Sequence, residues 1–348
     1  MKNKTEVMSA TNARKHDANP QSLSRRKLLL GLALAPLSMS SFAQTAVTKW
    51  VPDRSLRLII PFAAGGATDV VARLVMEPLG ARLGQRIVID NRGGANGIIA
   101  ARAALAAPAD GYTLFLGAIG TQAINPYIYP KMAVDPDLFV AIAAVNTVPT
   151  VFAISRDGRA KSLEDVIKLG ASGQGNYGHW AVASVPHIAG EMLKKQAGIP
   201  KLEGIQYQGA AQCLQALIGG QIDIANLPLS LAQAQGDRLK IVGLASTSRL
   251  PGSPDIPTMA ELGYPVDIEA WYGVFAPPGT PQAIVDSLTA EINATIAEPA
   301  LRKRMIEISL NPQSFPTAQA YQAWIQGERK RWTAVLRELG IEPMQTPT

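Results

Sequence analysis

Cysteine and histidine are scarce in this chain of 348 residues, which has one cysteine, Cys213, and three histidines. A single cysteine cannot form an intrachain disulfide, even in an oxidising compartment. A zinc site would also need several carboxylates at ligand spacing, which the sequence does not offer, so neither a metal nor a cofactor is expected. Aromatic residues make up only 6% of the chain. Stability must therefore come from close packing of small and aliphatic side chains.

The common catalytic and nucleotide-binding motifs are missing as well. Gly-x-Ser-x-Gly, a Walker loop and His-Glu-x-x-His do not occur. Residues 173–178 match Gly-x-Gly-x-x-Gly, but a dinucleotide-binding turn must follow a strand and open a helix. Here the run follows an expected helix and precedes a short strand. We therefore interpret it as a helix-to-strand connection.

One arrangement keeps an enzymatic alternative open. Ser184 and His187 stand three residues apart at an expected helix start and would be the nucleophile and base of a hydrolase. No acid is placed beside them in the sequence. The simpler interpretation is that Ser184 caps the helix and His187 packs or forms a hydrogen bond nearby.

The first 43 residues have the pattern of a secretory signal peptide. Arg25 and Arg26 precede an apolar run at 28–39, which is shorter than the ~20 residues that span a bilayer. A small-x-small pattern ends at Ala43, so the mature chain is expected to start at Gln44. The twin arginine is compatible with Tat or Sec export to the periplasm.

The basic balance of the chain comes from this leader. The whole sequence has 33 Lys and Arg against 27 Asp and Glu, and without residues 1–43 the numbers are 26 and 25. The mature protein is thus nearly neutral. This balance gives no support to nucleic-acid binding.

About 305 mature residues are more than one core usually supports, so two α/β domains are expected. The first would be a parallel sheet, with strands at 58–60, 87–89 and 113–116 and helices at 68–83 and 97–106. The second would have strands at 202–207, 222–225 and 240–244 and helices at 162–169, 185–196, 210–218 and 229–235. Segments 139–155 and 266–275 would cross between them. Helices at 281–296, 300–308 and 318–339 would pack on the first domain.

The stretch from Arg57 to Asn96 is the organising unit of this pattern. A strand is expected to run through the small residues of 63–67 into a helix that Thr68 or Asp69 caps and Gly84 ends. Its apolar stripe would consist of Val70, Val71, Leu74, Val75 and Leu79. The N–H groups and dipole of such a helix start can bind an anion without a basic side chain. Loops 62–68, 93–96 and 117–122 should meet at the same sheet edge.

Several longer stretches carry a family resemblance. They include PFAAGGATD, LGQRIVIDNRGGANG, APADGYTLFLG, INPYIY, VPHIAGEMLKKQAG, YQGAAQCLQALIGGQIDI, NLPLSLAQ, LKIVGLASTSRLPGSPDIPTMAELGYP and WYGVFAPPGTP. In this order they resemble the Bug-type solute-binding proteins of tripartite tricarboxylate transporters. The resemblance implies a two-lobed, type II-like periplasmic-binding-protein fold with a ligand cleft between the lobes. We assign 44–149 plus 274–348 to lobe 1 and 150–273 to lobe 2.

The resemblance also implies a site and a function. A small carboxylate would be captured in the cleft, without catalysis, for uptake by membrane permease subunits, and the protein would be a monomer. The residues at matching positions are Phe62, Gly65, Gly66, Ala67, Thr68, Asp69, Thr121, Gln122, Ser184, His187, Tyr207, Gly209, Ala210 and Asn226. An alternative role is a ligand sensor that signals to a membrane receptor.

The chain departs from the family pattern at four positions. His179 and Trp180 stand where the family usually has small residues, and could fill part of the pocket. Gln208 and Ala225 stand where the family commonly has a charged residue. These losses of charge bear on which acid is bound.

Overall fold

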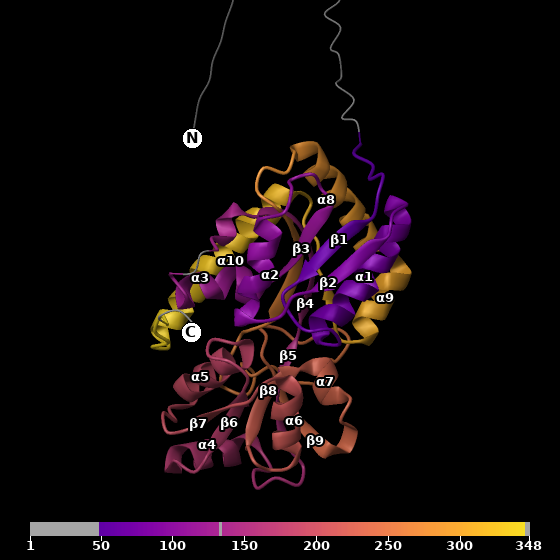
Figure 1. Cartoon of the computed structure of the whole chain (residues 1–348). Coiled ribbons are helices and arrows are strands. Elements are labelled where there is room, and N and C mark those ends of the chain that lie inside the picture. The colour runs from indigo at the N-terminus through magenta and orange to yellow at the C-terminus, as the bar shows by residue number, and fades with distance from the viewer. Residues whose placement is uncertain (1–48, 132–133, 345–348) are drawn as a thin grey trace, which may run out of the picture. The chain divides into compact units, whose positions relative to one another are not determined.

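Two mixed β-sheets organise the chain (Figure 1). The computed structural model describes residues 49–131 and 134–344, all within a unit that spans Val47–Thr348. The expected leader and its cleavage site lie outside these residues. No helix in the described ranges is both long and apolar enough to cross a bilayer.

The first sheet has the strand order β11-β4-β10-β3-β1-β2. Its strands are β1 (Leu56–Ile60), β2 (Ile87–Asn91), β3 (Thr113–Ala118), β4 (Val140–Val148), β10 (Ala270–Ala276) and β11 (Asn311–Pro312). β1 pairs in parallel with β2 and β3, as predicted, but β10 lies antiparallel between β3 and β4. The three predicted strands are thus parallel, but the sheet as a whole is mixed. The antiparallel part was not predicted, because a local βαβ pattern cannot show a strand that returns from far along the chain.

The second sheet has the order β7-β6-β8-β5-β9. Its strands are β5 (Thr150–Ser155), β6 (Asn176–His179), β7 (Glu203–Gln206), β8 (Ile224–Pro228) and β9 (Leu239–Leu244). β6, β7 and β8 are parallel, whereas β5 is antiparallel to β8 and β9. Only Pro149 separates β4 from β5, so the chain passes from one sheet to the other at this residue. The lobe boundaries themselves stay a prediction, and β10 enters the first sheet from Ala270.

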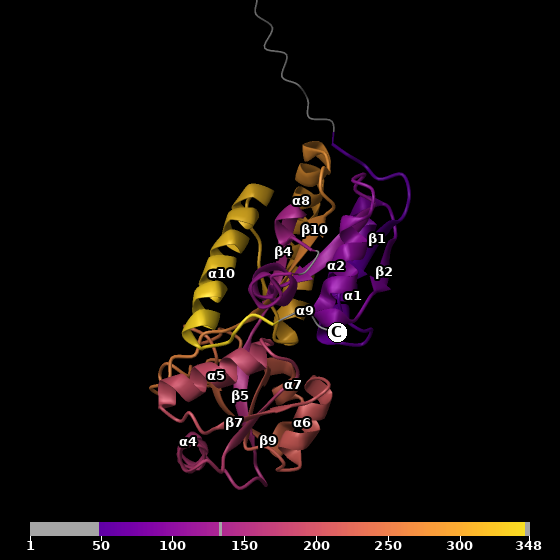
Figure 2. The same ribbon diagram turned by 60° about the vertical axis from the view of Figure 1, so that its left-hand side comes forward.

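Helices cover both faces of the first sheet. α1 (Ala67–Leu83), α8 (Gln282–Ala297) and α9 (Pro299–Glu307) share one apolar cluster, and α2 (Ile98–Leu105), α3 (Asn125–Ile128) and α10 (Ala318–Glu338) share another. Figure 2 shows α10 and α1 on opposite sides of the strands. The C-terminal helices were predicted to pack on this sheet, and α8 and α10 both contact β4.

The second sheet is covered in the same way. α4 (Leu163–Ser172) and α5 (Val185–Ala197) pack on one face, and α6 (Ala210–Ile218) and α7 (Leu229–Gln233) pack on the other. The α4 and α5 side belongs to the same apolar cluster as α10, and this cluster also includes Val266, Ile268 and Trp271. Residues 173–175 connect α4 to β6, and residues 176–178 are already part of β6, so the run 173–178 leads from a helix into a strand, as predicted, and opens no helix.

The start of α1 differs from the sequence prediction. Its N-cap residue is Gly66, and no side chain caps the helix. Asp69 instead accepts a hydrogen bond from the Gly65 N–H and two from Arg73, which draws its carboxylate away from the capping position. Val70 was expected in the buried stripe but is 48% exposed. Gly84 ends the helix in the left-handed conformation, as predicted.

Candidate ligand-binding site

The loops that follow β1, β2 and β3 touch one another. The Asn91 side-chain amide donates to the Phe62 carbonyl at 3.1 Å. Gly97 has φ of 87°, and a Cβ there would lie 2.9 Å from Pro61 and 2.7 Å from Thr121. Glycine is needed at this position for both its left-handed backbone and the close contact. The three loops that were predicted to meet at this sheet edge therefore do so.

Unpaired backbone donors stand at the start of α1. The first helical hydrogen bond is the one that the Val70 N–H donates to the Gly66 carbonyl at 3.1 Å. The N–H groups of Ala67, Thr68 and Asp69 have no partner among the described residues. Such groups, together with the positive end of the helix dipole, favour an anion.

The loop that leads to these donors is open to solvent. Residues 63–67 are all exposed, whereas the Thr68 side chain is buried and lies beside Tyr272. Tyr272 on β10 is paired with Ala118 at the end of β3. A ligand can thus approach the backbone of the loop while the side chains behind it stay fixed.

The basic side chains around this edge are already paired with carboxylates. Arg73 forms two hydrogen bonds to Asp69, at 2.9 and 3.1 Å. These bonds and the one from Gly65 lower the pKa of Asp69 against the opposing effect of burial. Arg92 likewise binds Asp90 at 2.9 Å. Neither arginine is a free cation for a ligand.

Thr121 and Gln122 lie in a short π-helical segment, η2 (Gly120–Ile124), directly after β3. The Thr121 hydroxyl accepts from the Ala118 N–H at 3.0 Å and lies 3.1 Å from the Ala118 carbonyl, to which it donates. It therefore holds the turn together. Gln122 is 1% exposed, and its amide nitrogen and oxygen have no partner in the described part of the chain.

A pair of facing glycines makes room beside Gln122. Gly117 on β3 and Gly273 on β10 are direct partners. A Cβ on Gly117 would lie 3.0 Å from the Gln122 side chain, and one on Gly273 would lie 1.8 Å from the Tyr321 hydroxyl oxygen. This hydroxyl is also buried and without a partner among the described groups. The ring of Phe275, 2.5 Å from the same Cβ on Gly117, and the side chains of Gln122 and Tyr321 thus occupy the space that the two glycines leave.

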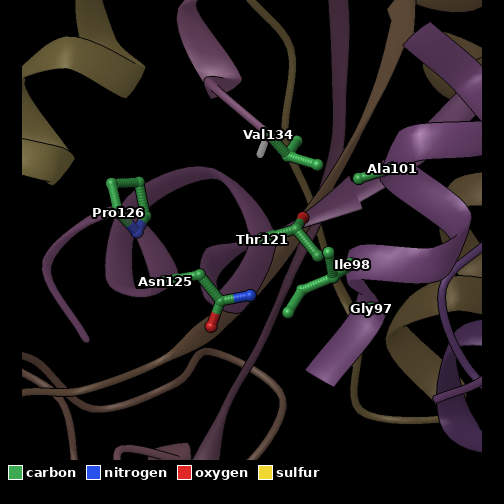
Figure 3. A pocket seen from close by; sticks show the side chains of 7 residues that line it. All are labelled: Gly97, Ile98, Ala101, Thr121, Asn125, Pro126 and Val134. Carbon is green, nitrogen blue, oxygen red and sulfur yellow. The ribbon is translucent and has the colours of Figure 1, made fainter. Parts of the chain in front are cut away.

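A small cavity lies beside Thr121, between α2 and η2 (Figure 3). Its volume is about 10 Å³, which is room for a single water molecule. It is lined by Gly97, Ile98, Ala101, Thr121, Asn125, Pro126 and Val134. An organic acid does not fit there, so this cavity is not the ligand site.

On the second sheet, Ser184 and His187 stand at the start of α5. Ser184 is the N-cap residue but its hydroxyl donates to the Ala181 carbonyl at 2.7 Å and caps no N–H, contrary to the prediction. The His187 Nδ1 accepts from the Ala183 N–H at 3.1 Å. Ala183 has φ of 58°, an uncommon value outside glycine. Ser184 and His187 therefore do not form a nucleophile–base hydrogen bond.

The other predicted residues of this sheet also lie at or near the ends of its parallel strands. The Tyr207 N–H, after β7, donates to the His179 carbonyl at 2.8 Å. Ala210 begins α6 after Gly209, again with no side-chain cap. Asn226, within β8, is buried, and its side-chain amide nitrogen donates to the Thr150 hydroxyl at 3.1 Å. Its side-chain amide oxygen has no partner among the described residues.

The contacts of His179 were not predicted from the sequence. It is only 4% exposed and packs against His187, with 4.7 Å between the ring centroids. Trp180 is half-buried against the apolar cluster of α6. The departure from the family pattern marked the position, but only the fold shows that the two imidazoles form a pair.

A wide groove lies between segments that pack on the two sheets. It has a volume of about 740 Å³ and runs between α9 and the α7 and 250–253 segments, beside Pro149. The Ser309 hydroxyl crosses it to the Gln233 side-chain oxygen at 2.8 Å. No cluster of three or more metal-ligating side chains occurs in the described ranges.

Two α/β units joined at crossing strands, with loops gathered at strand ends, define a two-lobed protein of the periplasmic-binding type. Residues 71–341 match the family described as tripartite tricarboxylate transporter family receptor, and the chain belongs to this family. Its solved neighbours agree with the predicted resemblance.

Three solved structures illustrate the likeness. The Rhodopseudomonas palustris protein Rpa4515 with adipate is 31% identical, with a TM-score of 0.78 over 84% of this chain and 99% of that one. The periplasmic binding protein BugD is 29% identical, with a TM-score of 0.75 over 84% and 100%. MatC from Rhodopseudomonas palustris with bound malate is 30% identical, with a TM-score of 0.73 over 82% and 99%.

Proposed function

We propose that this protein captures a small organic acid in a cleft between its two lobes and delivers it to a tripartite tricarboxylate-type permease. The carboxylate would bind the backbone N–H groups of Ala67, Thr68 and Asp69 at the start of α1. Gly66, a predicted site residue, instead donates its N–H to the Ala63 carbonyl at 3.4 Å. The observation that carries this proposal is a solvent-open helix start with three N–H groups that have no partner among the described residues, while the nearby Arg73 and Arg92 are both paired with carboxylates. Adipate and malate, the ligands of two related proteins, are both dicarboxylates.

The remaining predicted residues complete the proposed site. Phe62, Gly65 and Asp69 would shape the anchor loop, while Thr121 and Gln122 would support it from behind. Loops on the second sheet would contact the rest of the ligand, through positions 184, 187, 207, 209, 210 and 226. The α5 and α6 starts in these loops lack a side-chain cap, so they too present backbone donors.

The cellular setting follows from the leader and the charge balance. A Sec or Tat signal at residues 1–43 would export the chain to the periplasm, where it would act as a monomer and bind no nucleic acid. A sensor that reports ligand to a membrane receptor would use the same site. A neighbouring permease gene would favour transport over sensing.

A hydrolase built on Ser184 and His187 is the weaker alternative. The serine hydroxyl and His187 Nδ1 each bond a different backbone group. No carboxylate forms a hydrogen bond with His187 in the described part of the chain. We therefore propose binding without catalysis.

Native mass spectrometry of the protein purified without denaturation tests for a co-purified acid. Isothermal titration with dicarboxylates of four to eight carbons then gives affinity and stoichiometry. One site with submillimolar affinity for at least one of these acids is expected. If the folded protein binds none of them and carries no acid, the proposed function is wrong.

A further inference from the structure

The pair of His179, which is buried, and His187, which is partly buried, has a fixed arrangement of protons. A backbone N–H can only donate, so His187 Nδ1, which accepts from Ala183, must be unprotonated in the neutral ring. Its proton is then on Nε2. His179 Nδ1 lies 3.2 Å from the Ala181 carbonyl, an acceptor, so it carries the proton and Nε2 has the lone pair.

The two Nε2 atoms have no hydrogen-bond partner among the described residues. One is a donor and the other an acceptor, on rings whose centroids are 4.7 Å apart. They do not bond each other. The pair therefore presents complementary hydrogen-bonding groups at the end of β6, on the sheet edge where the proposed ligand loops gather.

The surroundings keep both rings neutral. Burial is the main cause that lowers the pKa of His179, and burial together with His179 lowers the pKa of His187 to about 4. The charged neighbours oppose each other, since Glu191 favours protonation and Lys194 disfavours it. Glu191 also accepts hydrogen bonds from Tyr177 at 2.6 Å and Lys194 at 2.8 Å, which partly satisfy its charge.

We propose that this imidazole pair binds the end of the ligand opposite its carboxylate anchor and selects a group that both donates and accepts a hydrogen bond. A hydroxyl, a primary amide or a protonated carboxyl group meets this requirement. A carboxylate does not, because it would face the His179 lone pair. A dicarboxylate should therefore take up one proton from the buffer when it binds. This inference rests on the proposed function, since it assigns the far end of the same ligand.

The main test uses four probes of equal length that share one carboxylate: hexanoate, 6-hydroxyhexanoate, adipamate and adipate, or their homologues at the best chain length. Titration at pH 7 in two buffers of different ionisation enthalpy measures affinity and proton uptake. The hydroxyl and amide probes should bind roughly tenfold more tightly than hexanoate, without proton uptake. Adipate should take up about one proton.

A variant sharpens this test. His179→Phe keeps a ring against His187 but removes the lone pair, so the preference for the hydroxyl and amide probes over hexanoate and the proton uptake with adipate should both disappear. Equal binding of all four probes without proton uptake would overturn the inference and leave the proposed function intact. Failure of every carboxylate to bind would remove both.

Histidine nitrogen NMR on the unliganded mature chain tests the proton arrangement without any variant of the pair. The chain from Gln44 has two histidines, His179 and His187, so every histidine signal belongs to the pair. We expect the Nε2–H form of His187 and the Nδ1–H form of His179 at pH 7. Any other pattern, or a charged ring, would refute the proposal.

Discussion

Arg73 and Asp69 form a two-point ion pair within the first turns of α1, with distances of 2.9 and 3.1 Å. The carboxylate is buried, whereas the guanidinium is largely exposed. This pair leaves the anchor loop without net charge from either residue. The anion at the helix start would then be held by backbone groups alone.

Removing Arg73 should therefore weaken ligand binding indirectly. Arg73→Gln leaves the Asp69 carboxylate uncompensated beside a bound anion, and we expect a loss of roughly two- to fivefold in affinity. The double variant Arg73→Gln with Asp69→Asn should restore binding, because no negative charge remains. Calorimetric titration of the three proteins decides this. A double variant as weak as Arg73→Gln would identify Arg73 as a direct ligand contact.

Gly66→Val should damage binding without damaging the fold. Gly66 has φ of −77° and ψ of 170°, which any residue can adopt, and an added Cβ would meet only the Ala63 carbonyl at 3.4 Å. The side chain would stand over the free N–H groups and cost roughly tenfold to a hundredfold in affinity. Arg92→Ala is the matched control, because Arg92 is paired with Asp90. If only the arginine variant lost binding, the helix-start mechanism would be wrong.

Loss of the hydroxyl should have opposite effects on the stability of the protein at two buried tyrosines. The Tyr177 hydroxyl donates to Glu191 at 2.6 Å, so Tyr177→Phe should lower the free energy of unfolding by roughly 1–3 kcal/mol. The Tyr321 hydroxyl has no protein partner among the described groups, so Tyr321→Phe should be neutral or stabilising by up to about 1 kcal/mol. Urea denaturation of both variants gives the comparison. Equal destabilisation would contradict it.

Acid should destabilise the protein through His187. Its folded pKa of about 4 lies below the ordinary value of 6.5, so the unfolded chain binds more protons between these pH values. Stability should therefore rise from pH 4 to 6.5, by on the order of 3 kcal/mol from this group. His187→Gln should flatten the rise. Thermal unfolding across this pH range provides the measurement, and an unchanged slope in His187→Gln would count against the assignment.

Cys213 should be unreactive in the folded protein. It is fully buried, and burial raises its pKa to about 12, which suppresses the thiolate. A thiol reagent at pH 8 should modify no cysteine in native protein and one in denaturant. Rapid modification of native protein would show that α6 opens readily.

Most elements could be predicted from local patterns, because alternating strands and amphipathic helices carry their own period. The strand β10 could not be placed, since its position between β3 and β4 depends on packing of distant segments. The start of α1 was missed for a similar reason. Asp69 is a good capping residue in isolation, but Arg73 and Gly65 take its carboxylate in the fold.

The candidate site was predicted as a set of loops, and its internal bonding was not. Glycines and strand ends indicate where a chain can turn, so the loops at 62–68, 93–96 and 117–122 were expected at one edge. The roles of Ser184 and His187 depend on the bend at Ala183, which no spacing rule gives. No spacing rule predicts the contact between His179 and His187 either, because it joins the end of β6 to the start of α5.

The groove between α9 and the 250–253 segment makes the protein suitable for a fluorescent sensor. Ile306 lines this groove and is 49% exposed, so Ile306→Cys would offer an accessible thiol at low structural cost. The native Cys213 is buried and would stay unlabelled, so no background cysteine need be removed. Movement of one sheet against the other would change the width of the groove around the dye. Ligand capture could then be followed in real time as a change in the fluorescence of the dye, without a labelled acid.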